Sequence, residues 1–118
     1  MGPLQGSLAA ALLAAACASH ACDVPDDGTS LRRALLKVKY LPETEAWELE
    51  ARKRAPVQYL LSLDAPLDRD GRCYWPIEAR SDGKPWNTFY VTPRGEDVLV
   101  AGPGGALLTL DAWRETIR

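Results

Sequence analysis

Hydrophobic positions follow a helical period in one stretch of the chain and alternate with polar positions in the next. Leu31, Leu35 and Val38 fall on one helical stripe, with basic residues mostly off it. Thr29 or Ser30 precedes the stripe and can cap the first turn with its hydroxyl. The spacing therefore predicts a helix that begins at Leu31.

A proline separates this helix from a second one. Pro42 interrupts the first stripe because its ring clashes with the preceding turn, yet proline is well tolerated in the first turn of a new helix. Glu43 and Glu45 suit the positive N-terminus of such a helix. We predict a second helix over residues 42–54, ended by Pro56.

From residue 57 the period changes to two, which predicts half-buried strands. The expected strands cover residues 57–63, 73–80, 86–92 and 98–100, with a short edge strand over 106–110. Asp111 is expected to cap a terminal helix. The connections are too short for crossover helices. The predicted class is α+β, with N-terminal helices packed on one face of a four- to five-stranded antiparallel meander and a short C-terminal helix.

Polar segments, some of them containing glycine, separate these strands. Asp82-Gly83 supplies the positive φ that a tight hairpin turn needs. Residues 64–71 are expected to form a plain connection, and residues 93–96 another turn.

Both faces of the predicted sheet carry large side chains, although an antiparallel sheet usually leaves one face polar. Trp75, Ile77 and Leu61 form the more apolar set, and we assign them to the core under the helices. The candidate protein-binding residues are Tyr74, Glu78, Arg80, Trp86 and Phe89. Their aromatic area indicates either a docking surface or a surface that the terminal helix covers with Trp113.

The segment from about Leu8 to Ala21 is typical of a signal sequence. Its apolar run carries no charge and is too short to span a bilayer. Cleavage before Cys22 is one expectation. Ala14-Ala15-Ala16-Cys17 is similar to a bacterial lipobox, so cleavage before Cys17 with a lipid attached to that residue is the other.

These boundaries divide the chain into three parts. Residues 1–21 are expected to be a signal sequence, 22–30 a polar tether and 31–118 a single α+β domain. Removing 21 of the 118 residues leaves 97, enough for one domain with a modest core. The expected location is the periplasm, or the bacterial envelope through a membrane anchor.

Export would place the cysteines in an oxidising compartment, where paired cysteines tend to be bonded. Cys22 and Cys73 both survive either route of processing. A bond between them closes a loop of about 50 residues, which the chain-entropy model values at about 4 kcal/mol. We predict this disulfide, with two unrelated thiols as the alternative.

The overall charge argues against electrostatic binding of nucleic acid or an anionic membrane surface. The formal net charge is −2, and no run of Lys or Arg dominates one stretch. Another protein is the expected partner, and the oligomeric state is left open.

Several kinds of chemistry are excluded or disfavoured. The only histidine, His20, lies before the predicted domain, which excludes Ser/His, Cys/His and His-ligated metal sites within it. Asp68-Arg-Asp-Gly71 lacks the ligands of a calcium loop, and Gly102-Pro-Gly-Gly105 lacks the Lys-Ser/Thr end of a phosphate loop. Asp64 and Glu78 could face each other as an acid–base pair, but their spacing does not distinguish them from solvated residues. No cofactor is expected.

The C-terminal half resembles a known pattern. The strings Trp86–Val91, Val98–Val100 and Leu110–Arg114 are similar to small, mostly uncharacterised envelope lipoproteins of Gram-negative bacteria. The resemblance covers about Leu41 to Arg114, and its most specific element is the closing Leu-Asp-x-Trp-Arg. The layout of that family is similar to cystatin-like and nuclear-transport-factor-like domains, some of which act as inhibitors or immunity proteins. The resemblance implies export and binding, and no catalytic residues.

Three functions remain open at this point. The first is an exported binding protein, of inhibitor or immunity type, that acts by protein–protein contact. The second is a structural or accessory envelope protein or lipoprotein without an inhibitory role. The third is a hydrolase that uses Asp and Glu alone.

Overall fold

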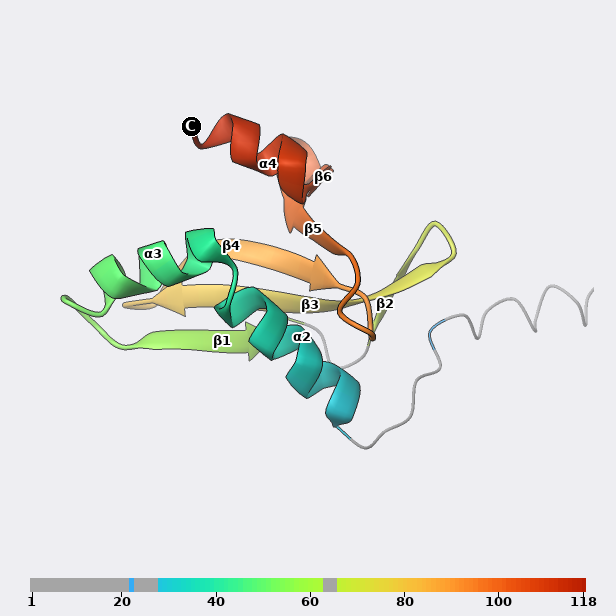
Figure 1. The fold of residues 1–118 in the computed structure, drawn as a ribbon, viewed down its shortest axis with the longest axis horizontal. Helices are drawn as coiled ribbons and strands as arrows, with labels where there is room; N and C mark the ends of the chain where they lie inside the picture. Colours follow the sequence, from blue (N-terminus) through green and yellow to red (C-terminus); the bar gives the residue numbers. More distant parts are fainter. Residues whose placement is uncertain (1–21, 23–27, 63–65) are drawn as a thin grey trace, which may run out of the picture.

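The fold is described from a computed structural model, for residues 22, 28–62 and 66–118. The elements are α2 (Thr29–Lys39), α3 (Pro42–Ala51), β1 (Val57–Leu61), β2 (Leu67–Arg69), β3 (Arg72–Ser81), β4 (Lys84–Val91), β5 (Val98–Ala101), a 3₁₀ turn (Pro103–Gly105), β6 (Leu107–Thr109) and α4 (Leu110–Thr116). Figure 1 shows them in sequence colours. The signal sequence and most of the tether lie outside the described residues.

The strands form one antiparallel meander, as predicted. Its order is β1-β3-β4-β5-β6, and every pair of neighbours on this path is antiparallel. A sixth strand, β2, pairs with the first residues of β3, and residues 62–66 separate it from β1. The expected plain connection over residues 64–71 therefore includes a strand. Asp70 and Gly71 have φ values of 53° and 78° and turn the chain from β2 into β3, which is the backbone that a two-residue hairpin needs.

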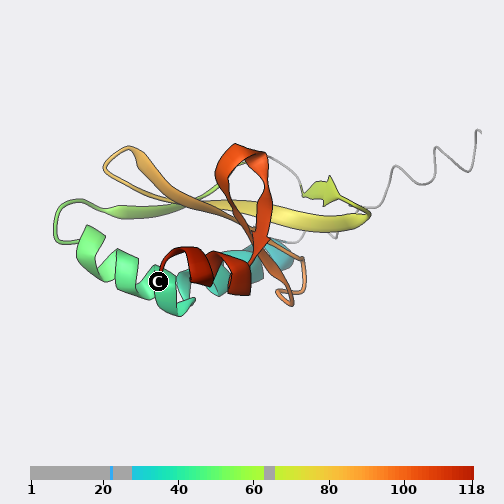
Figure 2. The ribbon, with the colours of Figure 1, turned by 90° about the horizontal axis from the view of Figure 1, so that it is seen from above.

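All three described helices lie on the same face of the sheet (Figure 2). The predicted α+β class is thus confirmed, and α4 joins the N-terminal helices in a single layer. The core between the layers contains Ile77, Phe89, Val91, Val100 and Val38, each with no exposed surface.

α3 begins at Pro42, as predicted, whereas α2 and α4 begin before the expected residues. α2 starts after Gly28, which has φ of 77° and gives no side-chain cap. Ser30 does not cap the helix, because it lies inside the first turn, and its Oγ accepts a hydrogen bond from Nε1 of Trp75 at 3.0 Å. α4 is capped by Thr109, whose Oγ1 accepts from the backbone N–H of Ala112.

A bulge in β4 decides which of its side chains face the helices. Ala79 pairs with Asn87 and Arg80 with Pro85, so Trp86 is an extra residue between them. A bulge changes the alternation of faces along a strand. Trp86 consequently joins Phe89 on the helix-covered face, where both pack in the core cluster.

Candidate functional site

The five candidate protein-binding residues do not form one surface. Tyr74, Glu78 and Arg80 alternate along β3 on the face away from the helices. Trp86 and Phe89 lie on the opposite, helix-covered face. Neither of these two rings shares a face of the sheet with Tyr74 and Arg80.

Tyr74 was expected at the surface, but it is only 4% exposed. Leu67 of β2 lies opposite it, and a neighbouring ion pair lies over its ring. Arg72, two residues earlier on the same face, binds the carboxylate of Asp97. Its guanidinium carbon thereby lies 5.9 Å from the centroid of the Tyr74 ring, in a cation–π position. Arg72, from the same strand, covers part of the Tyr74 ring. Tyr74 is therefore too buried to insert into a pocket on a partner protein.

Glu78 and Arg80 remain partly exposed, and each is held by the other. Their side chains form an ion pair of 3.2 Å and are 24% and 30% exposed respectively. Arg80 also donates a hydrogen bond of 2.9 Å to the carbonyl oxygen of Gly83 in the adjacent hairpin turn. The pair stabilises the β3–β4 hairpin, and it leaves Glu78 with a fixed cationic neighbour.

Trp86 and Phe89 belong to a cluster of four rings that fastens the helices to the sheet. Trp86 stacks on Trp47 of α3, with centroids 4.6 Å apart and planes 4° from parallel. Trp113 of α4 meets Trp86 and Phe89 edge-on, at 6.0 and 5.6 Å. Of the two interpretations of the aromatic excess, cover by the terminal helix through Trp113 is the one the structure supports for these rings.

Three polar contacts fix the helix layer in place. Glu43 accepts two hydrogen bonds from Arg114, at 2.8 and 3.2 Å, which link α3 to α4. The Tyr59 hydroxyl donates to Glu48 at 2.6 Å, which links β1 to α3. Burial, and then this hydrogen bond, raise the pKa of Tyr59, while the same hydrogen bond lowers the pKa of Glu48. These groups are structural ties between elements.

The open face of the sheet, meaning the face away from the helices, presents a different set of side chains. One cross-strand row contains Pro76, Tyr90 and Leu99, ending at Thr109 on β6. The neighbouring row begins with Leu60, which is 40% exposed, and continues to Glu78. Large apolar side chains thus lie beside one ion pair on the face that none of the described helices covers (Figure 2).

A shallow hollow of about 390 Å³ lies at the end of this row. Leu99, Thr109 and Tyr74 contribute to its lining, together with Arg72 and Arg114. Because Leu110, Asp111 and Arg114 of α4 also line it, the hollow lies between the open face and the helix layer.

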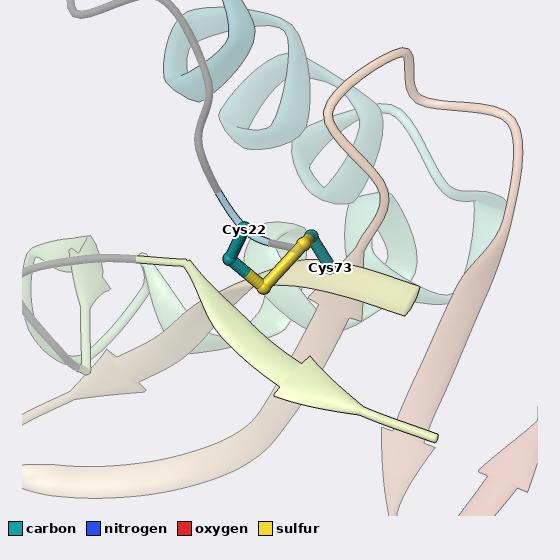
Figure 3. The surroundings of a disulfide bond; sticks show 2 residues. All are labelled: Cys22 and Cys73. Carbon is teal, nitrogen blue, oxygen red and sulfur yellow. A yellow bond between two sulfur atoms is a disulfide. The ribbon is translucent and has the colours of Figure 1, made fainter. Parts of the chain in front are cut away.

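The predicted Cys22–Cys73 disulfide is present (Figure 3). The two Cα atoms are 5.2 Å apart, within the range that disulfides require. Cys73 lies on β3 opposite Asp68 of β2. The bond therefore attaches the N-terminal segment directly to the sheet. The lipidation candidate Cys17 lies outside the described residues.

The residues considered for calcium binding, phosphate binding and acid–base catalysis form no such site within the described residues. Asp68 and Asp70 belong to β2 and its turn, and Gly102–Gly105 forms the 3₁₀ connection before β6. No group of three or more His, Cys, Asp or Glu side chains gathers in residues 22, 28–62 and 66–118. Asp64, the proposed partner of Glu78, and His20 lie outside those ranges.

Within the same ranges, none of the helices has the length and apolar character needed to cross a membrane. No protein-family model matches the chain, and neither the curated proteins nor the solved structures contain a significant match. The resemblance to Gram-negative envelope lipoproteins therefore stays a prediction.

Proposed function

We propose that this is an exported envelope protein that binds another protein through the open face of its sheet, as inhibitors and immunity proteins do. The observation that carries the proposal is the one-sided layer of helices. It leaves Leu60, Tyr90 and Leu99 on a sheet face that no described helix covers. Leu60 is exposed, Tyr90 and Leu99 are half-buried, and Pro76 between them is fully buried. Accessible apolar side chains grouped beside charged ones are typical of protein-binding surfaces.

The disulfide supports the exported location, because such bonds persist in oxidising compartments. Export itself can be tested by intact mass of the protein recovered from the envelope fraction. The expected species begins at Cys17 or at Cys22. A protein that retains Met1 would contradict export.

The binding surface can be tested by site-specific crosslinking in the source organism. A photo-crosslinking amino acid at position 60 should give a discrete heavier adduct, because Leu60 is exposed beside the apolar row. The matched control is Ile117, which is 52% exposed at the end of α4 and away from the open face. Equal adducts from both positions, or none from position 60, would contradict the open face as the binding surface.

A second candidate is an accessory envelope protein without an inhibitory role. The four-ring cluster favours it, since these aromatic side chains pack against the protein's own helices. In that case no specific adduct forms at position 60. A hydrolase that uses only carboxylates is the third hypothesis, and the Glu78–Arg80 ion pair gives it no support.

A further inference from the structure

The outward side of α2 combines cations with exposed apolar side chains. We define the α2 surface as Arg32, Arg33, Leu36, Lys39 and Tyr40. On a helical projection these residues lie within about 60° of Leu36. Ala34 and Val38, on the opposite side of the helix, are fully buried against the sheet. The α2 surface therefore points away from the sheet.

The two apolar side chains of this surface are exposed to solvent. Leu36 is 45% exposed and Tyr40 is 63% exposed, one helical turn apart. The turn between β4 and β5 lies beside α2 on this side of the molecule and contacts Arg33 (Figure 2). Arg33 reaches sideways to the carbonyl oxygen of Pro93 at 3.3 Å, and its charge stays at the surface.

The charge of α2 has a single sign. Residues Thr29–Lys39 contain Arg32, Arg33, Lys37 and Lys39 and no acidic residue. The formal net charge of the whole chain is nevertheless −2. The expectation that anionic surfaces are poor partners came from that total and from the lack of a dominant run of Lys or Arg. The total adds the acidic tether and the four glutamates of α3 to the basic helix.

We propose that the α2 surface docks on an anionic lipid bilayer. Interfacial helices place apolar side chains among the lipid headgroups, with Lys and Arg beside them at the anionic surface. Leu36 and Tyr40, flanked by Arg32, Arg33 and Lys39, match that arrangement. Docking in this orientation keeps the open face of the sheet directed away from the membrane.

Two other occupants fit the surface less well. A second copy would bring the cations of one α2 against those of the other, which is repulsive. A nucleic acid would neutralise the cations, but it would leave Leu36 without an apolar partner. The bilayer is the partner that satisfies both the charged and the apolar side chains.

The test uses the full-length gene product carrying Cys17→Ser, so that no lipid can be attached at that residue. Its binding is measured by flotation with vesicles of equal parts phosphatidylglycerol and phosphatidylcholine, and with vesicles of phosphatidylcholine alone. We expect binding to the anionic vesicles only, weakened by salt. Binding to both compositions alike, or to neither, would overturn the proposal.

Variants then locate the surface. Arg32→Glu and Lys39→Glu should each weaken vesicle binding by about fivefold or more, the factor that corresponds to about 1 kcal/mol per basic residue. Leu36→Ser should also weaken it. The matched controls are Lys84→Glu in the β3–β4 turn and Leu60→Ser on the open face, both exposed and on other parts of the molecule. Circular dichroism checks that every variant is folded.

Three results would contradict the lipid assignment. The first is an equal loss of binding in the control variants. The second is a dimer in sedimentation velocity that Leu36→Ser dissociates, which would identify a second copy as the occupant. The third is tighter binding of a DNA duplex than of vesicles, unaffected by Leu36→Ser. The vesicle assay contains no protein partner. A negative result in it would therefore contradict the lipid proposal without bearing on the crosslinking test at Leu60.

Discussion

Two buried threonines differ in whether the hydroxyl group has a hydrogen-bond partner. Thr44 on α3 is fully buried, and its Oγ1 has no hydrogen-bond partner in the described part of the chain. Thr92, after β4, is 6% exposed, and its Oγ1 accepts hydrogen bonds from the backbone N–H groups of Glu96 and Asp97. A buried polar atom without a partner costs about 1–3 kcal/mol.

We therefore expect Thr44→Val to raise the free energy of unfolding by about 1 kcal/mol, because the change removes an unsatisfied hydroxyl and keeps the β-branched shape. Thr92→Val is the matched control with the opposite sign. It should lower the stability by about 1 kcal/mol, since two backbone N–H groups lose their acceptor. Urea denaturation measures both. A loss of stability in Thr44→Val would show that its hydroxyl has a partner in solution.

Single residues also show where the sequence is a poor guide to the site. Tyr74 was placed on the correct face, but its burial depends on Arg72 and Asp97, which are 25 residues apart in the chain. Trp86 was misplaced because one bulge residue shifts the alternation. Neither a long-range ion pair nor a bulge leaves a periodic signal. Asp70-Gly71, in contrast, is a recognisable turn signal. It is the same dipeptide as Asp82-Gly83 and could have revealed β2.

Among the elements, α3 and α4 are joined by a charged contact between distant parts of the sequence. Glu43, in the first turn of α3, accepts two hydrogen bonds from Arg114 of α4. These hydrogen bonds lower the pKa of Glu43 below its ordinary value of 4.5, against the opposing effect of burial. The folded state therefore favours the ionised carboxylate.

This contact should make stability depend on pH in the acidic range. A depressed pKa contributes stability that is complete above the ordinary value and is lost as pH falls through the folded-state value. We expect the wild type to lose more stability below about pH 4.5 than Glu43→Gln does. Thermal melts across that range measure the difference. Glu45→Gln, exposed in the same turn and outside the contact with Arg114, is the control, and an equal change in both variants would contradict the prediction.

The elements themselves were largely predictable, because hydrophobic period and turn residues are local signals. The helices, the meander and the edge strand β6 were expected, with ends that differ by a few residues. The caps were less predictable. Ser30 is a good capping residue, but it binds Trp75 across 45 residues instead, and Thr109 replaces Asp111. Local propensity cannot anticipate a competing tertiary partner.

At the scale of the whole molecule, the basic helix α2 and the open face of the sheet lie on opposite sides. The basic side chains of α2 lie on the outside of the helix layer. The class and the disulfide followed from the sequence, whereas this separation required the fold. Net charge is a sum over residues and contains no information about the face on which each one lies.

The Cys22–Cys73 bond also determines how mechanical load would pass through the molecule. Tension applied between the two ends crosses from Cys22 to Cys73 through the sulfur atoms. α2, α3, β1 and β2 all lie between the two cysteines, so they form a covalent loop that bears no load. A force applied to an anchored N-terminus would act on β3, within the sheet, and α2 would carry none of it.

Single-molecule extension can test this load path. With the disulfide intact, only the residues after Cys73 can be drawn out, about 160 Å of extended chain. Reductant should release the enclosed loop, whose sequence separation is 51, and add about 180 Å in the same molecule. Equal lengths before and after reduction would mean that the chain is loaded from its first helix. If the lengths differ as expected, the sheet rather than the helix layer is the part of this protein built to withstand a pull.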